Sequence, residues 1–381
     1  MRIAFTGDLS ATGRFGERMA RNEEVFSEEL LDILSGCDRV VANFEGPATA
    51  VRASTDYGFE VVSAPASVAY LAARGITVFN LGNNHLFDCG EEGYADTVRN
   101  IQAAGVLHFG AGRLGDNGFD TVVVEKEGLR VALLSVTDGL SPAAGKQRAG
   151  TAVFRSIGAL RERIAYLRDV GKADRIVINY HGGEEYTRIP MPAKRDLLRR
   201  FAALPVDAVV AHHSHVYQGY EVVDGRPVFY SLGNFMFDIP PHRKRDDTDK
   251  GSLVVLELSG SGVVWSLVPL RVDRESGSVS CGEATDELFS RLTLPHVADP
   301  RVAWLADAHR TLFDNRRHRE GAGTAGPTTA ASGQRSLRRY LSSQHLKTLW
   351  TLFRTPDTRP VLCAALKYLV LRKLGLLRVR A

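Results

Sequence analysis

The sequence is poor in cysteine and contains neither a long apolar run nor an apolar leader. Its four cysteines (Cys37, Cys89, Cys281 and Cys363) are scattered, with no Cys-x-x-Cys spacing. This distribution argues against a disulfide framework and a thiolate metal site, and it is typical of a reducing compartment. No apolar stretch approaches the ~20 residues of a membrane span. The N-terminal "MRIAFTGDLS" reads as a strand and lacks the apolar core of a signal peptide. We therefore expect a cytoplasmic protein.

Acidic residues are scarce toward the C-terminus. Residues 301–381 contain 16 Lys and Arg against 4 Asp and Glu, a balance of +12; because the whole chain carries +4, residues 1–300 carry −8. The low-complexity stretch "EGAGTAGPTTAASGQR" lies near this change and has the composition of a flexible linker. We therefore expect a main body at 1–280, a helical or irregular extension at 281–319, a linker at 320–335 and a basic helical segment at 336–381.

Apolar runs and helical patterns alternate along the body. Several runs are near-continuous in Val, Ile and Leu, as in strands covered on both faces; they occupy 2–7, 39–45, 77–82, 129–136, 175–180, 208–213, 227–233 and 252–258. Helical spacing of apolar residues covers 26–37, 91–105, 157–171 and 193–205. The alternation predicts an α/β fold with a mixed sheet and helices on its faces.

Polar residues that can bind metal follow many of these predicted strands, where α/β folds bind their ligands. They are Asp8, Glu45, Asn83, Asn84, His85, His181, His212, His213, His215 and Asn234. Taken singly, Asp8 and Glu45 are also typical of turns, and Asp88 of a helix N-cap. Together, carboxylate, amide and imidazole groups on one rim form the mixed nitrogen and oxygen ligand set of Zn, Mn or Fe. The sequence therefore predicts a metal site.

The histidine pair in "VVAHHSHVYQ" (209–218) supports this prediction. Alternate residues of an extended segment face the same way, so His213 and His215 could both reach one metal centre. By the same alternation His212 should face elsewhere.

Several motifs resemble those of a known family. "GD" near the N-terminus, a Gly-Asn-x-His element, a strand-borne His and a terminal His-x-His follow the order of the calcineurin-like metallophosphoesterases. "NFEGP", "LGNNHLFDCGEEGYADT", "HGGEEYTRIP" and "DAVVAHHSHVYQGYEVVDGRPVFYSLGNFMFD" resemble the CapA family of poly-γ-glutamate capsule proteins, over roughly residues 1–260. The resemblance implies a four-layer α/β/β/α sandwich of the metallophosphatase type, here with a small C-terminal helical extension.

The resemblance also implies a ligand set for one or two divalent ions (Mn, Zn or Fe), namely Asp8, Glu45, Asn84, His181, His213 and His215. His85 takes the place of the histidine that faces the substrate, and Asp88 could orient it. Three departures stand out. Ser10 occupies a position where the phosphoesterases have histidine, Glu45 replaces their bridging aspartate, and the His-Trp-Gly of the CapA proteins reads His181-Gly182-Gly183 here, which we expect to open space beside the site.

Other residues are candidates for binding substrate. Arg14, in the glycine-flanked "ATGRFG", is a candidate clamp for a phosphate or carboxylate, with a solvated loop arginine as the alternative. Glu185 and Tyr186 match the Glu-Tyr of the CapA proteins. Asn83 and Asn234 follow the turn glycines Gly82 and Gly233.

We expect a metal-dependent hydrolase or transferase that acts in capsule, polyglutamate-like polymer or specialised-metabolite assembly. Its substrate would be a small molecule or polymer with phosphate or carboxylate groups. Two alternatives stay open: a non-catalytic scaffold subunit of a synthase complex, and a phosphodiesterase or phosphatase of an unrelated pathway. The tail shows no zinc-finger or helix-turn-helix spacing, so we expect no nucleic acid partner.

The basic tail has two interpretations. The segment 358–381 mixes leucines with Lys and Arg and could lie on an anionic membrane surface. Alternatively, its apolar residues pack against 337–353 in a helical hairpin. We favour the hairpin, with weak and salt-sensitive membrane contact at most.

Overall fold

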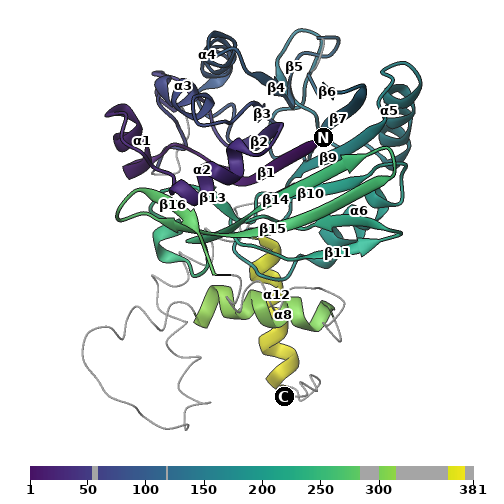
Figure 1. Cartoon of the computed structure of the whole chain (residues 1–381). Helices are drawn as coiled ribbons and strands as arrows, with labels where there is room; N and C mark the ends of the chain where they lie inside the picture. The colour runs from purple at the N-terminus through teal and green to yellow at the C-terminus, as the bar shows by residue number, and fades with distance from the viewer. Residues whose placement is uncertain (54–58, 117–118, 284–299, 315–358, 374–381) are drawn as a thin grey trace.

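The protein, seen here as a computed structural model, is built on two stacked sheets (Figure 1). The structure describes residues 1–53, 59–116, 119–283, 300–314 and 359–373. The first sheet has the order β16-β15-β14-β1-β2-β3-β4, with β13 paired to β1. Its strands are β1 (Arg2–Leu9), β2 (Arg39–Phe44), β3 (Val78–Asn80), β4 (Leu107–Phe109), β13 (Asn234–Met236), β14 (Lys250–Ser259), β15 (Gly262–Asp273) and β16 (Ser278–Cys281).

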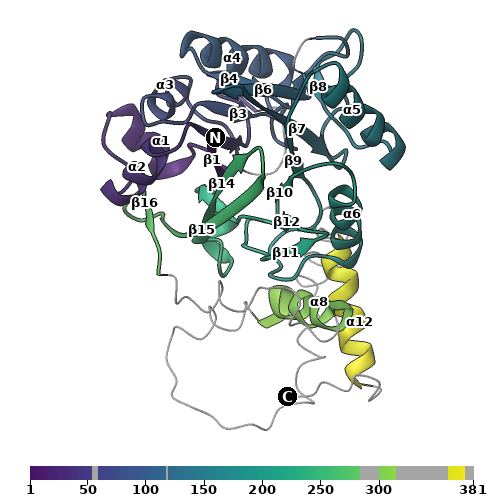
Figure 2. The same cartoon turned by 45° about the vertical axis from the view of Figure 1, so that its right-hand side comes forward.

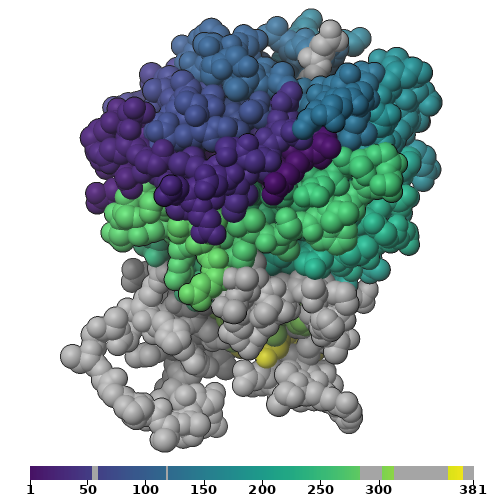
Figure 3. All heavy atoms as spheres, viewed as in Figure 1, coloured from purple at the N-terminus to yellow at the C-terminus, as the bar shows by residue number. Residues whose placement is uncertain are grey.

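The second sheet has the order β11-β12-β10-β9-β7-β6. Its strands are β6 (Thr121–Lys126), β7 (Leu129–Thr137), β9 (Arg175–His181), β10 (Ala208–His212), β11 (Tyr220–Val223) and β12 (Arg226–Phe229). A small ribbon pairs β5 (Ala111–Gly112) with β8 (Gly150–Thr151). In the space-filling view the late strands of the first sheet, in green, pack against the N-terminal part of the chain, in purple (Figure 3).

Alternation along the strands shows how the sheets stack. Ile3 and Phe5 of β1 share one buried cluster with Leu133 of β7 and Val177 of β9, so this cluster fills the space between the sheets. Ala4, which points the opposite way, belongs to a second cluster outside the first sheet. Both faces of each sheet are therefore covered, which explains why these strands read as continuous apolar runs.

Helices form the two outer layers. The first sheet is covered by α1 (Gly13–Ala20), α2 (Glu28–Ser35), α3 (Ala66–Ala72) and α4 (Gly90–Ala103), and the second by α5 (Ile157–Asp169) and α6 (Pro192–Ala202). Ser27 and Ser156 cap α2 and α5 by accepting a backbone N–H of the first turn. The predicted α/β/β/α sandwich is confirmed, and Figure 2 shows the helices flanking the sheets.

Parallel pairing of strands brings the polar residues at the strand ends close together. β1 pairs with β2 so that Asp8 lies opposite Asn43, and β9 pairs with β10 so that His181 lies opposite His212. Both pairs are parallel, so each brings the carboxyl ends of its strands to the same edge of its sheet. The two edges meet, because the backbone N–H of His213 donates to Asp8 across the sheets (3.2 Å to Oδ2).

The described part of the C-terminal region is a pair of packed helices. α8 (Pro300–His309) continues into η3 (Arg310–Asp314), and both contact α12 (Arg359–Lys373) through a cluster that includes Leu305, Leu312 and Leu362. Two predicted segments lie outside the described residues, namely the linker 320–335 and the expected helical partner of the tail, 337–353. In the described part of the chain, α12 packs on α8. None of the helices that the structure describes has the length and apolar character needed to cross a membrane.

Candidate metal centre

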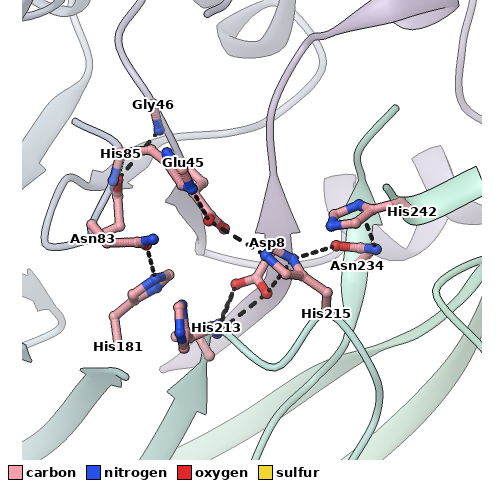
Figure 4. A network of polar contacts seen from close by, with 12 residues as sticks. Asp8, Glu45, Gly46, Asn83, His85, His181, His213, His215, Asn234 and His242 are labelled. Carbon is pink, nitrogen blue, oxygen red and sulfur yellow. Dashed lines mark hydrogen bonds and ion pairs between the residues drawn. The ribbon is translucent and has the colours of Figure 1, made fainter. Parts of the chain in front are cut away.

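Two overlapping groups of side chains could each hold an ion. One consists of Glu45, His181 and His213, the other of Asp8, Glu45 and His215, and within each group the ligand atoms lie within 4.8 Å of one another. Figure 4 shows these side chains converging around one space. Glu45 belongs to both groups, which is the arrangement expected of a carboxylate that bridges two ions. All five residues are buried.

The first group comes from both sheets. His181 ends β9 and His213 follows β10, and their ring centroids lie 5.0 Å apart. Asn84, in the loop after β3, places its side-chain oxygen 2.8 Å from Nε2 of His181. The predicted ligands Glu45, Asn84, His181 and His213 are therefore together.

The second group is organised around Asp8. His215 places its Nδ1 3.3 Å from Asp8 Oδ2 and its Nε2 3.6 Å from Glu45 Oε1. The other oxygen of Asp8 accepts the side-chain N–H of Asn43 (2.9 Å). Asn43 stands two positions before Glu45 at the end of the same predicted strand, but no pattern in the sequence indicates a role for it in the site.

The hydrogen-bonding state of these residues tests whether they fit a divalent cation. Among the residues that the structure describes, both carboxylate oxygens of Glu45 and both ring nitrogens of His213 are buried without a hydrogen-bond partner. Leaving one such group unsatisfied costs about 1–3 kcal/mol, and more when it is charged. The unpaired atoms belong to the very side chains whose donor types suit Zn, Mn or Fe. The residues present fit such an ion.

The electrostatics agree with this fit. Burial lowers the pKa of His181 and of His213 well below the ordinary value, so both rings are neutral, as a metal ligand must be. Burial also raises the pKa of Glu45 well above its ordinary value. For His215, burial acts to lower the pKa, but the carboxylates of Glu45 and Asp8 outweigh it and raise the pKa to about 10. The centre therefore favours positive charge between its two carboxylates.

The backbone of the His-x-His segment is unusual and corrects the alternation argument. His213 has φ +91° and His215 has φ +55°, values in the left-handed region that side-chain-bearing residues rarely adopt. Because β10 ends at His212, strand alternation does not extend across the segment. His212 was expected to face elsewhere, but its Nδ1 lies 3.7 Å from Asp8 Oδ1. It is buried next to the aspartate of the centre.

Two contacts hold the intervening Ser214. Its hydroxyl accepts from the Nζ of Lys194 (2.9 Å), and its carbonyl accepts the backbone N–H of Tyr186 (2.8 Å). Lys194, in α6, is buried, and its Nζ also donates to the side chain of Gln218 (3.0 Å). Sequence reasoning missed Lys194, because "PAKRDLLRRF" reads as a solvated basic helix.

His85 and Asp88 form a pair at the edge of the centre. The Nδ1 of His85 lies 2.8 Å from Asp88 Oδ2, and its Nε2 lies 4.0 Å from Glu45 Oε1. The N-cap of α4 is Cys89, so Asp88 is not the cap of that helix. This geometry is the one in which Asp88 orients the imidazole and leaves Nε2 turned toward the centre.

The residues expected to bind substrate have different surroundings. Asn83 is buried and joins two loops: its oxygen accepts from the backbone of Gly46 (3.3 Å) and His85 (3.1 Å), and its nitrogen donates to Phe44 (2.8 Å). Asn234 is also buried, with its oxygen 3.0 Å from Nδ1 of His215. These contacts show that both amides help to hold the centre together, and substrate binding by either amide stays a prediction.

Arg14 and Tyr186 have different surroundings, and substrate binding by Tyr186 stays a prediction. Arg14 is exposed on α1, its backbone N–H donates to Asp238 (3.2 Å), and its side chain lies beside Gly277. The alternative of a solvated arginine describes it better than a clamp at the centre. Tyr186 stacks on His215 with ring centroids 6.0 Å apart, and the neighbouring Glu185 is half-buried.

Two further differences concern the surroundings of the histidines. We expected Gly182 to open space beside the site, but a Cβ built there would lie 2.4 Å from the carboxylate of Asp138, so this aspartate fills the position. Ser10 is buried and its hydroxyl has no hydrogen-bond partner among the described residues. His242 was also missed: it is buried with its ring centroid 4.3 Å from that of His215.

This chain is similar to a protein family model, to two capsule or PGA biosynthesis proteins and to a solved structure. A family model described as Bacterial capsule synthesis protein PGA_cap matches residues 2–239. The capsule biosynthesis protein CapA of Bacillus anthracis is 32% identical over 252 residues, which span 64% of this chain but 60% of that protein, less than two thirds of its length. The PGA biosynthesis protein CapA of Bacillus subtilis (strain 168) is 31% identical over 322 residues, 82% of this chain and 81% of that protein. A solved structure of a hypothetical protein from Thermus thermophilus aligns with a TM-score of 0.44 and 17% identity, covering 71% of this chain and 98% of that one.

Proposed function

Because the chain belongs to the bacterial capsule synthesis protein family PGA_cap, we propose that it is a metal-dependent hydrolase or transferase. Its substrate is a capsule or polyglutamate-like polymer, or a precursor of one, with carboxylate or phosphate groups. The observation that carries the proposal is Glu45, a buried glutamate shared by two potential ion positions, whose carboxylate oxygens both lack a hydrogen-bond partner among the described residues. Burying a carboxylate without hydrogen bonds is costly, and an ion held by both oxygens would offset that cost.

The roles of the residues follow from their places. Asp8, Glu45, Asn84, His181, His213 and His215 would hold one or two divalent ions, which when bound supply an activated water and polarise a carbonyl or phosphoryl oxygen. His85, with Nε2 turned toward the centre, donates a proton to the leaving group. Asp88 accepts a hydrogen bond from Nδ1 of His85 and so keeps the Nε2 position available for this transfer.

Replacement of His85 by asparagine tests the chemistry apart from metal binding. We expect the variant to bind metal as the native protein does and to lose roughly 10²–10⁴-fold in turnover, the usual contribution of a general acid. Metal content and single-turnover rates on poly-γ-glutamate and on a generic phosphodiester measure the two quantities. Asp88→Asn, which keeps the shape but weakens the orientation of the ring, should give a smaller loss. Full turnover in His85→Asn would leave His85 with a structural role.

A second candidate function is that of a non-catalytic scaffold in a polymer-synthase complex. Ser10 favours it, since a buried hydroxyl without a hydrogen-bond partner in the described part of the chain stands where the phosphoesterases have histidine. Metal analysis separates the two candidates. Two equivalents of Mn, Fe or Zn together with turnover support the enzyme. No metal in the native protein, and full polymer synthesis by cells that carry His213→Ala, support the scaffold.

A further inference from the structure

A polar hollow of about 470 Å³ lies beside the metal centre. His242 links the two, since it lines the hollow and its ring centroid lies 4.3 Å from that of His215. Figure 4 shows His242 beside Asn234, which in turn contacts His215. The remaining lining is almost entirely charged and consists of Arg243, Arg245, Asp246, Asp247, Asp249, Arg274 and Glu275. The question is which of these charges are already neutralised by the protein itself.

Most of the carboxylates in the lining are paired. Asp247 forms an ion pair with Arg188, and Asp249 forms one with Arg271 (3.2 Å). Glu275 pairs with Arg243 (2.6 Å), which also binds Asp238. The fourth carboxylate, Asp246, is exposed to solvent.

Two guanidinium groups of the hollow have a different environment. Arg274 is 8% exposed and donates to backbone carbonyls, those of Phe237 (2.8 Å) and Thr248. Arg245 is half-buried and donates to the carbonyl of Thr311 (3.1 Å). In the part of the chain that the structure describes, neither forms an ion pair with a carboxylate. The five N–H donors of a guanidinium therefore remain largely available on Arg245.

Arg245 is fixed in orientation next to a residue of the centre. Its guanidinium carbon lies 5.0 Å from the ring centroid of Tyr186, and that ring also packs against His215 and His242. Thr311 holds both partners, since its carbonyl accepts from Arg245 and its hydroxyl donates to the carbonyl of Tyr186 (3.1 Å). Asp307 supports the same loop by accepting the backbone N–H groups of Arg188 and Ile189. The C-terminal α8–η3 segment, which lies beyond the matched residues 2–239, thus positions this arginine.

We propose that Arg245, with Arg274 beside it, binds an oxyanion of the substrate, a carboxylate or a phosphate, one aromatic ring away from the metal centre. A planar guanidinium with free donors matches the two oxygens of either group in a forked hydrogen bond. The assignment of this anion to the substrate rests on the proposed function. A γ-linked glutamate polymer carries one carboxylate on every residue, so a bond held at the metal centre always has such a group on its neighbour.

Binding measurements on the full chain test the subsite without relying on turnover. The probes are γ-linked triglutamate, the same peptide with its free α-carboxylates amidated, and inorganic phosphate. Each probe is titrated calorimetrically into Mn-loaded and into chelator-treated protein. We expect triglutamate to bind both forms, and Arg245→Gln to weaken this binding by about 10- to 100-fold, the usual effect of losing a charge-assisted hydrogen bond. Arg245→Lys should recover part of the loss. The amidated peptide should bind weakly to every form.

Two control variants separate anion binding from loosening of the C-terminal segment. Arg74→Gln removes an arginine from an ion pair with Glu24, neither of which lines the hollow, and should leave triglutamate binding unchanged. Thr311→Val removes the hydroxyl that holds Tyr186 but keeps the charge of Arg245, so it should weaken binding less than Arg245→Gln. Equal losses in Arg245→Lys, Arg245→Gln and Thr311→Val would show that Arg245 is a structural contact, and would overturn the proposal.

The remaining outcomes are also decisive. Competition by millimolar phosphate that depends on Arg245 identifies the anion as a phosphate, and triglutamate binding that phosphate does not displace identifies it as a carboxylate. Binding of these probes that requires Mn and ignores Arg245→Gln places the anion on the metal and overturns the subsite, while the proposed function stands. If the native protein contains no metal but still binds triglutamate through Arg245, the proposed function is overturned and the subsite stands.

Discussion

Replacing Glu45 by glutamine is expected to abolish binding of two ions and all metal-dependent turnover. The substitution keeps the volume of the side chain and removes its charge. Glu45 is common to both candidate ion positions, so its two carboxylate oxygens could each bind one cation. The glutamine amide has a single uncharged oxygen and cannot bridge two cations in this way. We expect metal affinity to fall by more than the roughly 10–100-fold that follows from the loss of an outer-shell partner. Metal analysis after dialysis and a calorimetric titration with Mn measure the change.

The melting temperature gives this prediction a second readout. Metal binding to the native state stabilises the native protein, and Glu45→Gln should lose that gain. Without metal, the variant should melt no lower than the native protein, because burial already raises the pKa of Glu45 well above its ordinary value and a neutral amide suits this environment. Glu221→Gln is the matched control, since Glu221 is a buried glutamate paired with Arg195 outside the centre. Native-like binding of two ions by Glu45→Gln would contradict the shared-carboxylate arrangement.

The parts of the fold that could be predicted are those whose pattern of apolar residues matches their pattern of burial. The predicted strand 175–180 corresponds to β9 (Arg175–His181), and the predicted helix 193–205 corresponds to α6 (Pro192–Ala202). Both were found because a continuous apolar run indicates a buried strand and a helical period of apolar residues indicates a helix with one buried face. β15 (Gly262–Asp273) was missed. Most of its residues are only partly buried or exposed, so the strand carries no continuous apolar signal.

Whether a residue of the centre could be predicted also depends on a clear apolar pattern next to it. Asp8, Glu45, His181 and His213 could be found because each follows or ends an apolar strand, and the sheet then brings these ends together. Lys194 and His242 carry no such signal. Lys194 lies in a helix with several basic residues, and its burial depends on Ser214 and Gln218 from another part of the chain. Contacts of this kind appear in the three-dimensional structure and not in local sequence patterns.

Replacing Lys194 by methionine is expected to lower metal affinity although Lys194 touches no candidate ligand. The substitution keeps the length of the side chain and removes the Nζ donor that holds Ser214 between His213 and His215. These two histidines have left-handed φ values, which cost of order 1–3 kcal/mol each and persist when surrounding contacts impose them. Without the bond from Lys194 the segment can relax and its rings leave the geometry of the centre. We expect a loss of roughly 10–100-fold in affinity for Mn, as for other residues that position ligands.

Controls distinguish this positioning role from a loss of stability. Lys194→Met leaves the acceptors on Ser214 and Gln218 unpaired and should cost about 1–3 kcal/mol in the free energy of unfolding. Leu198→Ala, one helical turn further along α6 in the buried core, should cost about 2–5 kcal/mol through a cavity and leave the metal affinity of the folded protein unchanged. A decrease in affinity in Lys194→Met alone therefore cannot result from destabilisation.

A double-mutant cycle with Ser214→Ala identifies the hydrogen bond responsible. If Lys194 acts through the Ser214 hydroxyl, the two substitutions remove the same interaction, and the double variant should bind Mn about as tightly as Lys194→Met alone. Additive losses would mean that Lys194 acts through another route, such as Gln218 and the buried Glu184 to which Gln218 donates (2.7 Å). Native affinity in Lys194→Met would show that Tyr186 and Asp8, through their own bonds to this segment, suffice to hold both histidines in place.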